Sequence, residues 1–359
     1  MQNLTDTEKT NEQLRVLGTE LKQKLLDDDC FARAPFVQIP HMMLVVLVYA
    51  GAYLVLLQQP ETGLRLLALV LLAFISVQAG YIAHEAGHGA ITRHRWLVVT
   101  IGQFFNTLLT ALCYSHFQKI HVCHHAHCNE RDEDIDLQSS LVSLYPEARQ
   151  KNSNTWAGRF ITRHQAYLIW PLISLQGFTL KIDSIKTLLQ NPKKTRIDQF
   201  VLLLHLLLWF GVPVYVLGLV DATLNYLLMT WFIGPYLGTV FLVNHIGTHV
   251  IQPEEKMPRF MRQLITTRNL GDSIMEDIFF GGLNNHIEHH LFPSIPSYSL
   301  RRARKIVRLF CRQHGLIYRE MTWRKAAREV FSYLERVARE PAADSLCTEN
   351  TGAIHARHR

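Results

Sequence analysis

Four long stretches of this chain contain no Asp, Glu, Lys or Arg: residues 42–57, 66–83, 201–220 and 222–243. A helix rises 1.5 Å per residue, so about 18–20 residues cover about 27–30 Å, the thickness of a bilayer's hydrocarbon core. A soluble protein could also be 48% hydrophobic and 19% charged, so the clustering of apolar residues decides the class. It predicts transmembrane helices at about 40–57, 65–83, 200–220 and 222–243.

Short connections arrange these predicted spans as two hairpins. Residues 58–63 join the first pair, and little more than Asp221 separates the second pair. Arg65 is the only Lys or Arg in either connection, although the chain has 37 such residues. The positive-inside rule therefore places the N-terminal, middle and C-terminal regions on the cytoplasmic side. We expect a cytoplasmic segment at 1–38, a membrane domain at 39–315, and a C-terminal helix with a disordered tail at 316–359.

Two further apolar stretches, 97–115 and 167–180, complicate this topology. The first is uncharged and long enough to span, but it contains Gln103, Asn106 and Thr107; the second is interrupted by Pro171 and Gly177. A single crossing at 97–115 would leave the histidines that follow it on the opposite side from the others. We therefore predict membrane-embedded or interfacial helices that do not cross, an inference that depends on the metal hypothesis below.

The remaining composition excludes several classes of protein. The net charge of +7 could suggest nucleic acid, but basic cytoplasmic loops of a membrane protein explain it better, so we expect no nucleic-acid partner. The polar first forty residues lack the apolar run of a secretory signal. Six cysteines without a CxxC pair fit a reducing cytosolic face. Residues 300–312 predict a basic amphipathic helix, either on an anionic membrane surface or with a solvated face.

Eight of the nineteen histidines fall into three clusters, each just after an apolar stretch: HEAGH at 84–88, HVCHH at 121–125 and HIEHH at 286–290. Imidazole is the commonest metal-ligating side chain, and eight imidazoles are too many for one ion. Helical spacing places the first and last histidines of the first two clusters on one face. His124 is close enough to reach a second ion. We predict a two-metal site with His84, His88, His121, His124, His125, His286, His289 and His290 as ligands.

Residues next to the clusters are candidates to complete or orient this site. NHIGTH follows the last span, and we favour His245 as a further ligand. A second set of side chains would hold the ligand imidazoles in place: Glu85, Asn244, His249, Asn285 and Glu288. The acidic run 130–136 either orients imidazoles in the same way or is a solvated loop. Cys123 and Cys128 would suit zinc, but simple packing explains them better.

Two other classes of function were weighed against the clusters. HEAGH alone matches the HExxH motif of zinc proteases, with Glu85 as general base. That motif requires only one further ligand and leaves two clusters unexplained. A metal transporter would carry ionisable ligands near the middle of the membrane, whereas these clusters lie at the ends of the spans.

The order HEAGH, HVCHH, HIEHH with intervening hairpins resembles the membrane fatty acid desaturase family, whose histidine boxes follow HxxxH, HxxHH and (H/Q)xxHH. The resemblance covers about residues 35–315. The block GGLNNHIEHHLFP is similar to front-end desaturases, which usually carry Gln where this chain has His286. Many of those carry a fused cytochrome b5 domain with an HPGG motif, which does not occur here.

This resemblance implies an all-α integral membrane protein: four transmembrane helices in two hairpins, membrane-embedded helices, and a cytoplasmic helical cap that holds a di-iron site. It implies that the box histidines bind two iron ions and that a histidine on the last span, which supports His245, joins them. O2 and two electrons would then remove hydrogens from the acyl chain of a lipid or thioester. An external ferredoxin- or cytochrome b5-like donor with its reductase would supply the electrons. A lipid or carotenoid hydroxylase on the same scaffold is the alternative.

Overall fold

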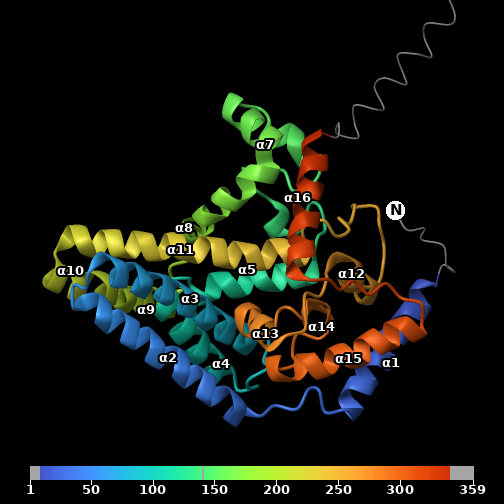
Figure 1. Cartoon of the computed structure of the whole chain (residues 1–359). Helices are drawn as coiled ribbons and strands as arrows, with labels where there is room; N and C mark the ends of the chain where they lie inside the picture. The colour runs from blue at the N-terminus through green and yellow to red at the C-terminus, as the bar shows by residue number, and fades with distance from the viewer. Residues whose placement is uncertain (1–8, 140, 340–359) are drawn as a thin grey trace, which may run out of the picture.

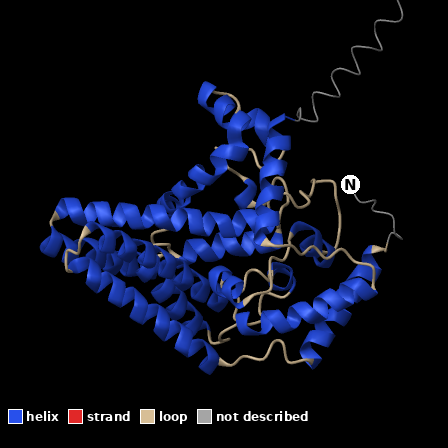
Figure 2. Cartoon of the chain, viewed as in Figure 1, coloured by secondary structure: helices blue, strands red, loops and turns tan. Residues whose placement is uncertain are grey.

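The computed structural model describes residues 9–139 and 141–339, and helices are the regular elements of these ranges. No strand occurs in these ranges (Figure 2), so the predicted all-α class is confirmed. The predicted disordered tail lies outside the described residues. Figure 1 shows a long bundle with the shorter helices gathered at one end.

Four helical segments are long and apolar enough to cross a membrane, and they match the four predicted spans. They are α2 (Pro35–Leu57), α3 (Thr62–Gly87), the run α9 (Arg196–Leu206), η4 (Leu207–Gly211) and α10 (Val212–Leu217), and α11 (Leu219–His245). The central pair α3 and α11 pack on each other, and 67% and 50% of their apolar windows are buried. Only 28% of the apolar window of α2 and 17% of that of the α9–α10 run are buried. The apolar surfaces of these helices therefore face outward, as lipid contact requires.

The second hairpin turns at Gly218, three residues before the predicted position. Gly218 has φ +84°, a conformation that glycine adopts without the steric penalty other residues meet. Asp221 instead lies in the first turn of α11, where its carboxylate pairs with Arg65 at 2.8 Å. The prediction of a break at Asp221 was wrong because this charge pairs with the neighbouring hairpin and does not end a helix.

The stretch 97–115 is a broken helix that returns to the end of the bundle it left. It comprises α4 (Arg95–Gly102), the π-helical η1 (Gln103–Leu108) and the start of α5 (Tyr114–Ala126). The chain reverses at Ala111, which has φ +60°. Polar side chains close this reversal: Asn106 Nδ2 donates to the carbonyl of Leu112 at 2.8 Å, and Thr107 Oγ1 accepts from the amide of Tyr114 at 3.0 Å. Asn106 and Thr107 therefore satisfy backbone groups of a turn inside the protein.

The stretch 167–180 is not one helix. It spans the end of α7 (Trp156–Leu172), the 3-10 turn η3 (Ile173–Leu175) and the start of α8 (Gln176–Gln190). This turn presses against α11, where a Cβ on Gly234 would lie 2.3 Å from the carbonyl oxygen of Ser174. Glycine there permits a backbone contact that any side chain would prevent.

The remaining described helices form a cap at the end of the bundle where α3 and α11 finish (Figure 1). They are α1 (Asn11–Asp27), η2 (Ile135–Leu137), α6 (Ala148–Asn152), α12 (Arg259–Thr266), α13 (Ile274–Phe280), α14 (His286–Leu291), α15 (Ser297–Gln313) and α16 (Trp323–Arg339). The apolar face of α15, including Leu300, Val307 and Phe310, is buried in a core shared with α1. Of the two readings of residues 300–312, the structure supports a helix with a solvated basic face.

Candidate metal centre

The first histidine cluster ends α3. His84 lies in the last turn and His88 caps the helix, and their ring centroids are 4.8 Å apart. The predicted placement of both rings on one face of a continuing helix is therefore what the structure shows. The second cluster lies on α5, where the rings of His121 and His125 are 4.5 Å apart. Phe117, one turn earlier, stacks on His121 at 5.1 Å and fixes that ring in the interior.

The third cluster forms the short helix α14, in which all six residues are buried. His245 is the last residue of α11 and is also buried. The ends of α3, α5 and α11 thus meet α14, and all nine predicted ligands lie in one interior region.

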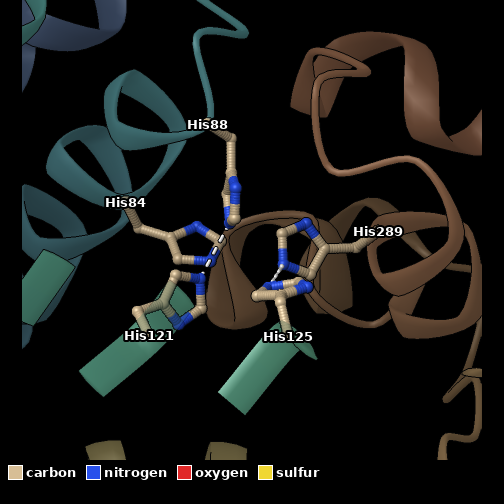
Figure 3. Close-up of side chains that lie close together, drawn as sticks. All are labelled: His84, His88, His121, His125 and His289. Carbon is tan, nitrogen blue, oxygen red and sulfur yellow. Dashed lines mark hydrogen bonds between the residues drawn. The ribbon is translucent and has the colours of Figure 1, made fainter. Parts of the chain in front are cut away.

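Five imidazoles make the first of two groups, shown in Figure 3: His84, His88, His121, His125 and His289. One ring nitrogen from each lies within 4.8 Å of the others. The Nε2 atoms of His88 and His121 are 2.8 Å apart, and those of His125 and His289 are 3.1 Å apart. We call these residues the five-histidine group.

The other four predicted ligands make a second, adjacent group: His124, His245, His286 and His290. Nε2 of His245 lies 2.7 Å from Nε2 of His286. His124 is 4.7 Å from His245 and 5.1 Å from His290 between ring centroids. We call these residues the four-histidine group. The rings of His125 and His290 stack with their centroids 4.3 Å apart, so the two groups are in direct contact.

The donor set fits transition-metal ions. Burial, with the neighbouring imidazoles, lowers the pKa of His121, His125, His289 and His290 well below the ordinary value, and that of His286 to about 3. These rings are therefore neutral at pH 7, and neutral nitrogen is the form that binds metal. His125 Nδ1 is buried without a hydrogen-bond partner. Imidazole alone suits iron, zinc, copper and nickel.

Fixed acceptors hold the outer nitrogens of three residues of the four-histidine group, whereas Nδ1 of His286 is buried without a hydrogen-bond partner. Nδ1 of His245 lies 3.2 Å from the carbonyl oxygen of Thr266, which can only accept a hydrogen bond. The proton is therefore on Nδ1, and Nε2 presents a lone pair toward His286. Nδ1 of His290 lies 2.9 Å from Gln263 Oε1. Such outer partners fix the tautomer and orientation of metal-binding histidines.

Asp134 is the outer partner of His124. Both carboxylate oxygens lie 3.1 Å from Nδ1, and the side chain is fully buried. Burial alone would lower the pKa of His124, but Asp134 outweighs it and raises this pKa to about 9. Of the two readings of the acidic run, the structure supports an orienting role for Asp134.

Asp134→Asn is expected to lower metal affinity of the four-histidine group by about 10- to 100-fold, because the neutral amide orients and polarises His124 less strongly. Metal content after dialysis against a graded chelator measures this effect. Asp136→Asn is the matched control, since Asp136 lies 3.3 Å from the same nitrogen but is 38% exposed. Equal metal retention in both variants would contradict an orienting role.

Glu85, predicted to orient a ligand imidazole, instead joins three helices. Its carboxylate accepts from Gln38 Nε2 at 2.7 Å, and from the amide and hydroxyl of Ser297 at 2.8 and 2.9 Å. It also borders a cavity of about 20 Å³ beside His84 and His289, room for about one water molecule. The contacts of Glu85 fasten α2 and α15 to the end of α3.

Glu288 is fully buried and faces away from the imidazoles. Its carboxylate accepts from Asn269 Nδ2 at 2.8 Å and from the hydroxyl of Tyr318 at 2.9 Å. Asn269 Oδ1 also accepts from the amide of Ile287 at 2.8 Å. These bonds anchor α14, and with it three candidate ligands, to the cap.

The other three residues predicted to hold the ligand imidazoles are His249, Asn285 and Asn244, and they lie in different surroundings. His249 is 45% exposed in its side chain and pairs with Glu255 at 2.7 Å, outside both groups. Asn285 precedes α14 and accepts from Arg304. Asn244 is buried and donates within its own helix, while its Oδ1 has no hydrogen-bond partner.

Sequence reasoning missed Gln263, Thr266 and Asn269 and assigned Cys128 only to packing. Cys128 Sγ is buried 3.5 Å from His245 Nδ1, on the side of the ring away from His286. Gln263 also donates to the carbonyl of His125 at 2.9 Å. None of these residues belongs to a spaced motif, so no sequence signal singled them out.

Comparison with known proteins agrees with this geometry. A family model described as "Fatty acid desaturase" matches residues 60–322, which include every residue of both histidine groups. The chain belongs to the fatty acid desaturase family. This assignment and the four apolar helices make it a membrane protein.

The individual relatives have low sequence identity to this desaturase-family chain, but the aligned regions cover most of it. It is 24% identical to the Acyl-lipid (9-3)-desaturase of Physcomitrium patens, over 92% of this chain and 64% of the relative. It is 27% identical to the Delta(8)-fatty-acid desaturase 1 of Arabidopsis thaliana, over 72% and 61%. Against the Delta(6)-fatty-acid desaturase fat-3 of Caenorhabditis elegans the identity is 28%, over 83% and 70%. The chain thus spans less than two thirds of the two plant relatives.

Proposed function

We propose that this chain is an O2-dependent desaturase that introduces a C=C bond into the acyl chain of a lipid or thioester. The observation that carries this proposal is the pair of adjacent imidazole groups at the end of an apolar bundle. The printed names of the relatives support an acyl substrate, since they include an acyl-lipid desaturase and fatty-acid desaturases.

Two iron ions would occupy the centre, one in each histidine group. The five-histidine group offers five neutral nitrogens to one ion. The four-histidine group offers four ring nitrogens to the other once metal binding displaces the second ring proton of His124, whose pKa of about 9 otherwise keeps it charged. Family membership favours iron over the other metals that imidazole suits. Cys128 is not among the proposed ligands, because its sulfur lies against the outer nitrogen of His245.

When bound, the iron ions and O2 would supply the oxidising chemistry that unactivated methylenes require and that side chains cannot provide. The chain's own residues position and isolate this chemistry. Asp134, Gln263 and the carbonyl of Thr266 hold three imidazoles by their outer nitrogens. The four-histidine group is buried, which keeps bulk water from it, whereas His84, His88 and His121 of the five-histidine group are partly exposed. Residues 97–115 and 167–180 are the proposed walls of a tunnel for the acyl chain, and the packing of α4 and η1 on α3 supports the first of these.

The histidine groups would face the cytoplasm, with the chain crossing the membrane four times. The positive-inside rule supports this orientation, because Arg65 is the only Lys or Arg in the hairpin connections. A ferredoxin- or cytochrome b5-like donor and its reductase would supply the electrons from the same side.

Metal analysis and lipid analysis of one detergent-purified sample test the function. About two irons per chain, and an acyl product two hydrogens lighter when O2 and a reductant are supplied, are the expected results. A hydroxylated product would indicate a lipid or carotenoid hydroxylase. One zinc per chain would contradict both the desaturase and the hydroxylase. Glu85→Gln separates desaturase from protease. Glutamine keeps the size of the side chain and one accepting oxygen for the contacts with Gln38 and Ser297, so we expect the variant to keep its iron and its activity within about threefold, whereas a hydrolase would be inactive.

A further inference from the structure

A pocket of about 360 Å³ opens on α16, outside the histidine groups. Four cationic side chains line it, from Arg319, Lys325, Arg328 and Arg336, together with Glu329 and Gly247. We call it the basic pocket. None of its lining residues has an apolar side chain, which is unsuited to an acyl chain and suited to an anionic partner.

The single carboxylate in the basic pocket is already engaged. Glu329 Oε2 accepts from Arg319 and from the fully buried Arg268, both at 2.9 Å. Within residues 9–139 and 141–339, no ion pair involves Lys325, Arg328 or Arg336. These three side chains leave the pocket with uncompensated positive charge.

The basic pocket lies directly behind the four-histidine group. Its Gly247 is two residues after His245, and Arg319 Nη1 lies 3.5 Å from the Gly247 carbonyl. Ile246, between them, is buried and accepts from Arg268. One residue, Ile246, therefore separates the wall of the pocket at Gly247 from His245 along the chain. Electron tunnelling is coupled better through such a covalent path than through gaps between side chains.

We propose that the basic pocket docks an acidic electron-transfer protein, which passes electrons through Gly247 and Ile246 to the His245 side of the centre. This inference rests on the proposed function and adds the place where the donor binds. Each encounter oxidises the donor by one electron and reduces one ferric ion to ferrous. Two encounters supply the two electrons that, with O2, two protons and two hydrogens from the acyl chain, yield a C=C bond and two water molecules.

The test reverses the uncompensated charges together, in the variant Lys325→Glu, Arg328→Glu, Arg336→Glu. The matched control makes the same charge change on α1 and α15, with Lys22→Glu, Lys305→Glu, Arg312→Glu. The probes are the soluble haem domain of a cytochrome b5 and a plant-type [2Fe–2S] ferredoxin. Two readouts are used: binding of the oxidised probe to metal-free chain, and the second-order rate of electron transfer from the reduced probe to iron-loaded chain.

We expect the pocket variant to bind more weakly and to accept electrons at least about tenfold more slowly at low salt, because electrostatic steering changes association rates by about 10- to 1,000-fold. Its rate should also lose most of its salt dependence. The control should change by less than about twofold, and both variants should keep wild-type iron content. They should also keep wild-type product formation with dithionite, measured as a single turnover in which dithionite reduces the chain, the excess is removed, and O2 is then added.

Equal rates in the pocket variant and the control would overturn the docking site. A matching fall in dithionite-driven product, with weaker binding to vesicles of anionic phospholipid, would overturn it in favour of a substrate headgroup site. If wild-type chain forms no product with dithionite, the proposed function fails, whereas the binding of oxidised probe to metal-free chain still reports on the docking surface separately.

Discussion

Replacing His289 with alanine is expected to empty the five-histidine group and to reduce product formation by at least about a thousandfold, because only a bound metal can supply the oxidising chemistry. His289 is central to that group: its Nε2 lies 3.1 Å from His125, and its ring centroid lies 4.7 Å from His84 and 5.0 Å from His88. Elemental analysis of the purified variant, alongside lipid product analysis, measures both effects.

Two further variants separate metal binding from folding. His289→Gln fills most of the same buried volume, so it should lose metal while unfolding at the temperature of metal-free wild type. His249→Ala removes a histidine that lies outside both groups and pairs with Glu255, so it should keep its metal and its activity within about twofold, as surface changes usually do. Full metal content in His289→Ala would contradict the proposed ligand set.

The spacing of the clusters predicted most of the site because helical geometry is local. Positions four apart share a face, which brings together His84 with His88 and His121 with His125. The same geometry turns His124 away from that face, toward the four-histidine group. The position of His245 directly after the last apolar span also identified it as a ligand candidate.

The outer partners could not be predicted in the same way, because they depend on contacts between distant segments. Gln263 and Asn269 come from α12 and the segment after it, 27 and 19 residues before the partners His290 and Glu288 that they bind. Nothing in the local pattern distinguishes them from ordinary polar residues. Glu85 was misleading for the opposite reason: it lies beside two ligands in sequence, but its helical direction points it toward Gln38 and Ser297.

The break at Gly218 shows a similar limit at the level of the fold. Asp221 is the only charged residue between the two apolar stretches 201–220 and 222–243, so the connection was predicted there. The charge has a partner in Arg65 across the bundle, and the backbone reverses where positive φ carries no penalty. Sequence reasoning identified the four long apolar helices of the described residues and their order, since these follow from length and hydropathy. It could not foresee a tertiary ion pair.

Asn269→Leu is expected to destabilise the protein by about 3–5 kcal/mol and to release metal from both histidine groups. The substitution keeps the volume but leaves the amide of Ile287 without its acceptor, and removes a donor from both Glu288 and Tyr318. Each buried polar group left unsatisfied costs about 1–3 kcal/mol. Because α14 carries His286, His289 and His290, loosening its anchor should disturb both groups. Thermal unfolding and elemental analysis of the purified variant measure the two effects.

A double-mutant cycle with Glu288→Leu tests whether the Asn269 effect acts through this anchor. Burial raises the pKa of the Glu288 carboxyl, and the donors from Asn269 and Tyr318 oppose that rise. Leaving the carboxyl without Asn269 is therefore costly, whereas replacing both partners with apolar groups removes that cost. We expect the double variant to be more stable than the sum of the single effects predicts, by at least about 1 kcal/mol. Additive effects would mean that Asn269 stabilises the cap without positioning the ligands of α14.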